Sequence, residues 1–248
     1  MNDSLKDKLS NIELVIFDLD GTLIDSNGLH NYLDIELARS LGENKSSEEI
    51  LQERDEVIKN NKIGDIYLIY CNYLKTKYNS GLSAEEILQI RRDLSKEISK
   101  DIKYKTDADK IIKYFKNHNK KLALATVSRR ETIDIYINEN ENIKNKCNIK
   151  DYFDFIVTKD DVTLKKPNPE VYNKIIEKFQ IKDLSKCVVI EDSLTGVLAA
   201  KNANLDVIVI YDKYSDKDRE KINELADYNV LDYKELINLL ECERRENG

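Results

Sequence analysis

Long apolar runs are missing from this sequence. No stretch approaches the roughly 20 apolar residues that span a bilayer, and the first thirteen residues, MNDSLKDKLSNIE, are too polar for a secretory signal. These two absences argue against a membrane partner. We therefore expect a cytoplasmic protein.

Closely spaced cysteines and a large excess of one charge are also lacking. Charged residues make up 35% of the chain, but both signs are interspersed and the net charge is only -7. That balance excludes the profile of a basic nucleic-acid-binding protein, so no nucleic-acid partner is expected. The cysteines lie far apart without a C-x-x-C pair, which predicts free reduced thiols rather than disulfides or a zinc site. They are Cys71, Cys147, Cys187 and Cys242.

The apolar pattern predicts an α/β protein. Short β-branched runs alternate with amphipathic helical segments such as residues 107–117, which indicates a parallel sheet covered by helices on both faces. The 248 residues suffice for one such domain and a smaller insertion. The polar segment 138–150 is expected to be a surface excursion. The predicted strands are Ile12–Phe17, Lys121–Thr126, Asp154–Thr158, Cys187–Glu191, Asp206–Ile210 and, with a weaker pattern, Tyr228–Leu231.

Residues 26–104 interrupt this alternation. They contain four helical patterns and no strand pattern, and the last helix is introduced by Ser83 and Glu86 in the spacing of a capping box. We predict an inserted helical domain at 26–104 and a sheet-containing core made of 1–25 and 105–248. The two connections between them can act as a hinge.

Two carboxylates follow the first predicted strand. Asp18 and Asp20 stand two residues apart where the strand enters a turn at Gly21, so both can point toward one site. Paired carboxylates of this kind suit Mg²⁺ and can divide the roles of nucleophile and proton donor. The alternative is a plain Asx-turn, in which an aspartate caps the turn.

Hydroxyl groups follow the second predicted strand. The hydroxyls of Thr126 and Ser128, with N–H groups at the start of the next helix, favour an anion site. Ser128 and Glu131 also have the spacing of a capping box at that helix start. Because capping alone would explain Ser128, Thr126 is the residue to which we assign a function.

A lysine pair precedes the next predicted helix. Pro167 restricts the backbone before it, so a lysine there can present a fixed positive charge to a phosphate and to the carboxylates. A surface lysine in a turn is the alternative. Asn168 and Pro169 then predict an N-cap and a first helical residue. The lysines concerned are Lys165 and Lys166.

Two acids follow a later buried strand directly. Glu191 and Asp192 stand at the end of strand 187–191, where uncompensated charge is costly, and a bound cation would offset that cost. Acids at a helix N-terminus are also favoured by the helix dipole, but this does not explain two of them at a strand end. Gly196, Ala199 and Ala200 predict a helix face that packs closely on the sheet.

These motifs together resemble those of the haloacid dehalogenase superfamily of phosphohydrolases, over about residues 12–212. The helical insertion is similar to the α-helical cap of this superfamily, and the core is then a Rossmann-like sheet. Within the superfamily the chain looks like the β-phosphoglucomutase and phosphoglycolate-phosphatase branch. The matching segments, in order, are Phe17–Thr22, Asp25–His30, Thr126, Lys166 and Glu191–Ser193.

The resemblance implies a role for each residue. Asp18 is then the nucleophile that forms an aspartyl-phosphate, and Asp20 is the acid and base. Thr126 and Lys166 neutralise the transferring oxygens, which suits phosphoryl transfer. The implied activity is hydrolysis of a small phosphorylated metabolite by a monomer or homodimer.

The resemblance also implies a Mg²⁺ cofactor and a substrate site. Asp18, the backbone carbonyl of Asp20, and Asp192 would hold Mg²⁺, with Glu191 as a further ligand. The implied substrate-binding residues are Ser26, His30, Val127 and Ser128.

The chain departs from the family pattern at four places, one of which is the long segment 138–150. Lys165 replaces the glycine that usually precedes the third-motif lysine, so Lys165 competes with Lys166 for that role. Lys105–Asp107 stands where a proline-glycine pair usually ends the cap, and Arg54 is a poor match to the mutase G-x-x-R loop. Two other functions stay open: a sugar-phosphate mutase, favoured by His30, and a non-catalytic regulatory protein, against which the intact motifs argue.

Overall fold

The computed structural model describes residues 2–60 and 65–241. The chain forms two compact units, one made of Met1–Ser26 with Asp101–Gly248 and the other of Asn27–Lys100. The predicted boundaries of the insertion lie one residue before and four residues after those of the second unit. That the second unit serves as a cap stays a prediction.

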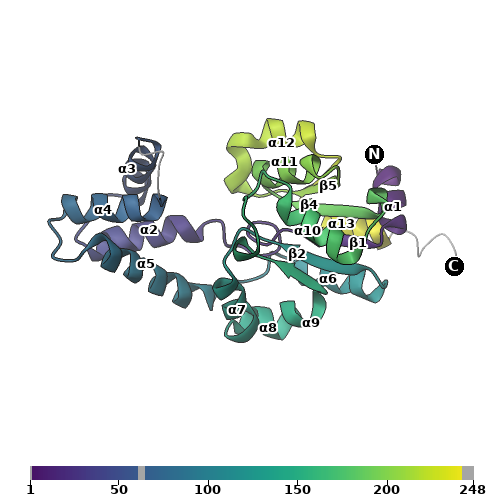
Figure 1. The fold of residues 1–248 in the computed structure, drawn as a ribbon, viewed down its shortest axis with the longest axis horizontal. Coiled ribbons are helices and arrows are strands. Elements are labelled where there is room, and N and C mark those ends of the chain that lie inside the picture. Colours follow the sequence, from purple (N-terminus) through teal and green to yellow (C-terminus); the bar gives the residue numbers. More distant parts are fainter. Residues whose placement is uncertain (1, 61–64, 242–248) are drawn as a thin grey trace. The chain divides into compact units, whose positions relative to one another are not determined.

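The first unit is built on a six-stranded parallel sheet with strand order β3-β2-β1-β4-β5-β6 (Figure 1). The order places β1 and β4 at the centre, and it confirms the predicted α/β fold with a Rossmann-like sheet. The strands are β1 (Leu14–Phe17), β2 (Lys121–Ala125), β3 (Phe155–Val157), β4 (Cys187–Glu191), β5 (Asp206–Ile210) and β6 (Tyr228–Val230).

Both faces of the sheet are covered by helices. Side chains alternate along β1, so that Phe17 packs in one hydrophobic cluster and Ile16 in the other. Figure 1 shows α11 and α12 on one face and α6, α8 and α9 on the other. The core helices are α1 (Asn2–Asn11), α6 (Ala108–Asn117), α7 (Arg130–Asn138), α8 (Glu141–Cys147), α9 (Ile149–Tyr152), α10 (Glu170–Phe179), α11 (Leu194–Asn202), α12 (Arg219–Leu225) and α13 (Tyr233–Glu241), with short 3-10 turns η1 (Lys159–Asp161), η2 (Leu184–Lys186) and η3 (Lys213–Asp218).

The register of the central strands brings their carboxyl ends together. Phe17, the last residue of β1, pairs with Leu124 on one side and with Ile190 on the other. The residues that follow β1, β2 and β4 therefore leave the sheet at the same edge. This edge carries the candidate site.

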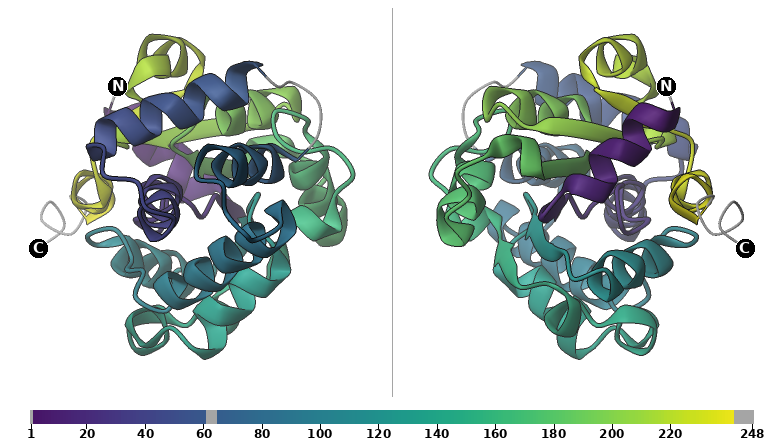
Figure 2. Two further views of the ribbon diagram at one scale, coloured as in Figure 1. Left: turned by 90° about the vertical axis from the view of Figure 1, so that its left-hand side faces the viewer. Right: turned by 90° about the vertical axis from the view of Figure 1, so that its right-hand side faces the viewer.

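The N-terminal segment forms a helix that the sequence pattern did not predict. Helix α1 packs beside α13, and Leu5 and Leu9 lie in the same hydrophobic cluster as Leu236 (Figure 2). Because the neighbouring residues of α1 are mostly polar, Leu5 and Leu9 do not stand out as a helical pattern in the sequence.

The prediction of a surface excursion at 138–150 is wrong. This segment contains α8 and α9, and Ile143, Cys147 and Ile149 are buried in the core. Asn140 caps α8 by accepting a bond from the Ile143 N–H, 2.9 Å away. The polar residues that suggested a loop form the solvent face of these short helices.

Helix α10 begins one residue later than predicted. Pro169 occupies the N-cap position instead of the first helical position. Asn168 still accepts a bond from the Glu170 N–H through Oδ1, at 3.0 Å, as a capping side chain does.

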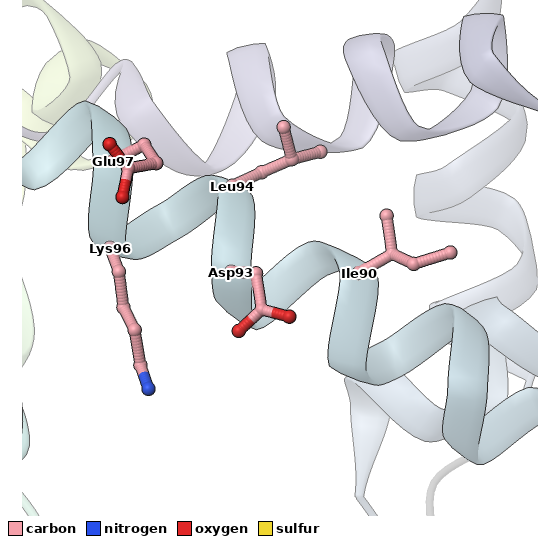
Figure 3. Close-up of a pocket in the computed structure, with 5 residues that line it drawn as sticks. All are labelled: Ile90, Asp93, Leu94, Lys96 and Glu97. Atoms are coloured by element: carbon pink, nitrogen blue, oxygen red, sulfur yellow. The ribbon is translucent and has the colours of Figure 1, made fainter.

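The second unit consists of four helices and, within its described residues, no strand, as predicted. The predicted capping box is present, because the Ser83 hydroxyl accepts from the Glu86 N–H and the Glu86 carboxylate accepts from the Ser83 N–H. A hollow of about 430 Å³ lies along α5 (Figure 3) and contains none of the candidate site residues. The helices are α2 (Leu29–Ser40), α3 (Ser47–Asn60), α4 (Ile66–Lys77) and α5 (Ala84–Ser99).

A buried ion cluster joins three of these helices. Asp34 of α2 accepts from Arg91 Nε of α5 at 2.7 Å and from Arg54 Nη1 of α3 at 3.0 Å. Asp34 is 1% exposed and Arg91 5% exposed. The guanidinium carbon of Arg91 also lies 3.9 Å from the centre of the Tyr67 ring, a cation–π contact. In this structure Arg54 thus helps to hold the helices of the second unit together.

Three cysteines are free, as predicted, namely Cys71, Cys147 and Cys187, and the structure shows that they are buried. Cys242 lies outside the described residues. Among the helices that the structure describes, none is long and apolar enough to cross a bilayer.

Candidate active site

The candidate site lies at the carboxyl edge of the sheet. Asp18 follows β1, Thr126 follows β2 and Asp192 follows β4. Parallel strands direct these residues to one edge, where ligands bind in open α/β sheets. Lys166, from the loop before α10, reaches the same edge.

The Lys166 ammonium lies between two carboxylates. Its Nζ donates to Asp18 Oδ1 at 2.7 Å and to Glu191 Oε1 at 2.6 Å. A third bond, to the carbonyl oxygen of Ala125 at 3.0 Å, fixes the ammonium at the end of β2. The Lys166 side chain is 3% exposed, whereas Lys165 is exposed, so the structure places Lys166 and not Lys165 among the acids.

Glu191 is held by hydrogen bonds on both carboxylate oxygens. Oε1 accepts from Lys166 and from the Tyr172 hydroxyl at 3.2 Å. Oε2 accepts from the Asp192 N–H at 3.0 Å, and from the Ser193 N–H and hydroxyl at 3.2 and 3.1 Å. These bonds give both oxygens of a fully buried carboxylate hydrogen-bond partners.

Three hydroxyl groups donate hydrogen bonds to the Asp20 carboxylate. Ser26 Oγ donates to Oδ1 at 2.6 Å, while Ser128 Oγ at 2.7 Å and Thr126 Oγ1 at 3.2 Å donate to Oδ2. The donors come from the turn after β1 and the loop after β2. They fix the direction of the Asp20 carboxylate, which a general acid requires.

The predicted capping role of Ser128 is wrong. Helix α7 begins at Arg130, with Arg129 at the N-cap position and without a side-chain cap. The Ser128 hydroxyl donates to Asp20 instead, and the Ser128 N–H donates to Thr126 Oγ1 at 2.9 Å. The loop after β2 is therefore two residues longer than predicted, and its hydroxyls turn inward to the site.

Asp192 completes the group of acids. Its Oδ1 accepts from Thr22 Oγ1 at 2.8 Å and its Oδ2 from Ser215 Oγ at 3.4 Å. Burial and the neighbouring Glu191 charge raise the pKa of Asp192 to about 7, against the opposing effect of the Thr22 hydroxyl. This site therefore disfavours the charged form of Asp192 unless a cation is near.

The acids form a cluster that suits a hard cation. One carboxylate oxygen from each of Asp18, Glu191 and Asp192 lies within 4.8 Å of the others. Burial, followed by the charge of Glu191, raises the pKa of Asp18 well above its usual range, although Lys166 opposes the shift. A divalent cation would act in the same direction as Lys166, and oxygen ligands are those that Mg²⁺ prefers. The residues present thus fit the metal that the sequence implies.

Two further residues were predicted to bind the substrate, namely Val127 and His30. The Val127 side chain is apolar and 46% exposed. His30 belongs to the second unit, where its ring lies 5.9 Å from that of Tyr67. Their contact with a substrate, like that of Ser26 and Ser128, stays a prediction.

Sequence reasoning missed several residues that contact the acids, among them Thr22, Tyr172 and Ser215. Thr22 lies in the first motif, Phe17–Thr22, where the sequence pattern assigned it no role. A hydroxyl in this otherwise apolar and acidic motif is the signal that could have indicated a contact with the acids. Tyr172 lies on the buried face of α10 beside Val171, where its pattern reads as core. The Tyr172 hydroxyl is the polar atom on that face that contacts Glu191.

Comparison with known proteins identifies the family. Residues 15–210 match the model of the haloacid dehalogenase-like hydrolases. The chain belongs to this family, which confirms the resemblance seen in the sequence motifs.

Individual relatives agree with this assignment. A phosphorylated carbohydrates phosphatase of Thermotoga maritima is 29% identical, over 79% of this chain and 84% of that protein. Hexitol phosphatase B of Escherichia coli is 25% identical, over 79% of this chain and 82% of that protein. A crystal structure described as a β-phosphoglucomutase from Thermotoga maritima superposes with a TM-score of 0.71 and 26% identity, covering 94% of this chain and 98% of that one. The chain is an enzyme, a phosphoric monoester hydrolase of the family.

Proposed function

We propose that this enzyme hydrolyses a small phosphorylated metabolite through an aspartyl-phosphate on Asp18, with Mg²⁺ as cofactor. The observation that carries the proposal is the contact of Lys166 with Asp18, 2.7 Å, beside an Asp20 carboxylate that three hydroxyls hold in place. This arrangement supplies a nucleophile, a cation for the phosphoryl group and an acid in one place.

In the first half of the reaction, an Asp18 carboxylate oxygen attacks phosphorus. The bond from phosphorus to the ester oxygen breaks, and Asp20 donates a proton to that oxygen as it leaves. Lys166 and the Thr126 hydroxyl stabilise the charge on the transferring oxygens.

In the second half, Asp20 acts as a base. It takes a proton from water, whose oxygen attacks phosphorus of the aspartyl-phosphate. The bond between phosphorus and the Asp18 oxygen breaks, which releases inorganic phosphate and restores the Asp18 carboxylate and the protonated Asp20.

Mg²⁺ belongs in this proposal as a ligand of the acid cluster. Asp18, Asp192 and the backbone carbonyl of Asp20 are the proposed ligands, with Glu191 as a further one. When bound, Mg²⁺ supplies positive charge that neutralises the phosphoryl oxygens. The support is the buried group of three carboxylates, two of which pair with the Lys166 ammonium, because a further cation lowers the cost of their burial.

The second unit is the proposed selector of the substrate. Both named phosphatase relatives act, by their names, on phosphorylated carbohydrates or hexitols. Sugar phosphates and polyol phosphates therefore come first as substrates for this chain, followed by phosphoglycolate, nucleoside monophosphates and pyridoxal phosphate.

The test is phosphate release from a panel of these phosphomonoesters with and without Mg²⁺. We expect turnover by the wild type that chelation abolishes, and a loss of about 10³-fold or more in Asp18→Asn. Asp134→Asn is the matched control, because Asp134 is exposed on α7, and its activity should equal that of the wild type. An Asp18→Asn protein that retains activity would contradict the proposed nucleophile.

A sugar-phosphate mutase is the second candidate, because of the structure described as a β-phosphoglucomutase. A mutase would convert β-glucose 1-phosphate to the 6-phosphate with little release of phosphate. Following both products in one reaction separates the two functions. The hydrolase proposal fails if the 6-phosphate accumulates and inorganic phosphate does not.

A further inference from the structure

Lys105 contacts two loops that border the candidate site. Its Nζ donates to the carbonyl oxygen of Gly21 at 2.6 Å, to that of Tyr211 at 3.2 Å, and to Asp212 Oδ2 at 2.7 Å. Its own N–H donates to the Leu23 carbonyl at 2.8 Å, which fixes the backbone of Lys105 beside the first motif. One ammonium thus joins the turn after β1 to the loop after β5.

The same two loops hold Asp192, one on each oxygen. Thr22 follows Gly21 in the first loop and donates to Asp192 Oδ1 at 2.8 Å. Ser215 stands three residues after Asp212 in the second loop and donates to Asp192 Oδ2 at 3.4 Å. The spacing between the two loops therefore determines the orientation of the Asp192 carboxylate.

Asp212 fixes the second loop at the point where Lys105 contacts it. Its carboxylate is buried, with the residue 4% exposed, and its Oδ1 caps η3 by accepting from the Tyr214 N–H at 2.9 Å. The other oxygen forms the ion pair with Lys105, whose side chain is 19% exposed. The ion pair therefore transmits the position of the first loop to the turn that carries Ser215.

We propose that Lys105 is a positioning residue for Asp192, and that it presets this carboxylate for the divalent cation. Lys105 holds the two loops at one spacing, so Thr22 and Ser215 orient both Asp192 oxygens before the cation binds. The inference rests on the proposed function in one respect, namely that Asp192 is a cation ligand. It adds a residue at the sequence position where a proline-glycine pair was expected.

Charge and position predict opposite results when Lys105 is removed. Replacing a lysine near a cation site by a neutral residue lowers the local positive charge, and charge alone would then strengthen Mg²⁺ binding. Loss of positioning weakens it, because groups that orient metal ligands typically contribute 10- to 100-fold in affinity. The direction of the change identifies the cause.

The experiment measures Mg²⁺ binding directly by isothermal titration calorimetry. Lys105→Met retains much of the apolar stem and should weaken Mg²⁺ binding about tenfold or more. Lys105→Arg keeps a donor of the same charge and should restore most of the affinity. Lys201→Met is the matched control, because Lys201 pairs with Asp227 at 2.8 Å near the start of β5, remote from the acids. The Mg²⁺ affinity of the Lys201→Met variant should equal that of the wild type.

A double variant protects the test against misfolding. Lys105→Met leaves the buried Asp212 carboxylate without its ion pair, whereas Lys105→Met with Asp212→Asn removes both charges together. The double variant has no net change of charge, so charge alone predicts wild-type affinity and positioning predicts weak binding. Unchanged or tighter Mg²⁺ binding in both variants would overturn the proposal.

Failure of the proposed function gives a different result. A wild-type protein that binds Mg²⁺ but releases phosphate from no phosphomonoester contradicts the hydrolase alone, and the Lys105 comparison still stands. A wild-type protein that binds no Mg²⁺ contradicts the cation site and, with it, the role of Lys105.

Discussion

A Cβ atom on Gly196 would lie 1.7 Å from Oε1 of Glu191. That oxygen also accepts bonds from Lys166 and Tyr172, so it cannot move without breaking them. Glu191 can therefore occupy this position only because Gly196, on α11, has no side chain. Through Glu191, Gly196 also affects the ammonium that contacts Asp18.

Gly196→Ala should therefore impair catalysis. The added methyl displaces the Glu191 carboxylate and with it Lys166, and a misplacement of about 1 Å near the reacting groups costs about 10²-fold in rate. The measurement is kcat on the best substrate of the panel. Gly81→Ala is the control, because nothing lies within 4 Å of a Cβ there. A Gly196→Ala enzyme with wild-type kcat would show that Glu191 does not position Lys166.

Ser26→Ala and Ser128→Ala should each weaken the acid function of Asp20. Each removes one hydroxyl that donates to the carboxylate formed when Asp20 gives up its proton. A hydrogen bond to a charged group contributes about 1.5 to 3 kcal/mol, or about 10- to 150-fold in rate.

The leaving group distinguishes this role from simple substrate binding. An alkyl phosphate needs a proton on its leaving oxygen, whereas p-nitrophenyl phosphate does not. We expect the two variants to lose kcat/KM on the alkyl ester and much less on the nitrophenyl ester. Equal losses on both esters would favour contact with the phosphoryl group instead.

Asp34→Asn should destabilise the second unit strongly. It leaves two arginines facing each other without the carboxylate between them, and removing one partner of a buried pair costs about 3 to 5 kcal/mol of unfolding free energy. Urea unfolding followed by circular dichroism measures the loss. Asp55→Asn is the control, because Asp55 pairs with Arg54 but its side chain is 67% exposed, and the cost there should stay below about 1 kcal/mol. Similar costs for both variants would contradict the role of burial.

Glu43 should make the stability of the second unit depend on pH. Bonds from Lys77, at 2.6 Å, and from the Tyr78 hydroxyl lower the pKa of Glu43 from 4.5 to about 2. Because the pKa is lower in the folded protein, this stabilisation is present above pH 4.5 and is lost as the pH falls to about 2.

The measurement is the difference in melting temperature between wild type and Glu43→Gln across this range. The variant should melt lower at pH 7, and the difference should shrink between pH 4.5 and pH 2. Glu48→Gln, at an exposed position of α3, should differ little from wild type throughout. A difference for Glu43→Gln that stays constant with pH would contradict the assignment.

The sequence predicted the positions of the candidate site residues in the fold better than their contacts. Asp18, Thr126 and Asp192 could be located because strand patterns mark the ends of parallel strands, which share one edge. Which of two adjacent lysines turns inward depends on side-chain direction, and no pattern in Lys165-Lys166 reveals it. The inward turn of Ser128 likewise depends on where α7 begins.

The missed helices have a different cause. Segment 138–150 buries three apolar residues, Ile143, Cys147 and Ile149, too few for a period to stand out among polar neighbours. Helix α1 likewise shows its apolar side at Leu5 and Leu9. Packing against the rest of the core, which no local window contains, stabilises these short helices.

The two connections to the second unit are bonded to each other where they leave the core. Ile24 and Tyr104 form an antiparallel bridge, and the Asp25 N–H donates to the Lys103 carbonyl at 3.0 Å. The chain thus departs from the sheet and returns to it at neighbouring points, as a hairpin does. We therefore expect the insertion to be modular: a short turn or an unrelated domain grafted between these points should leave the strand order and the acid cluster unchanged. Under the proposed function, in which the second unit selects the substrate, evolution can change substrate choice without altering the chemistry.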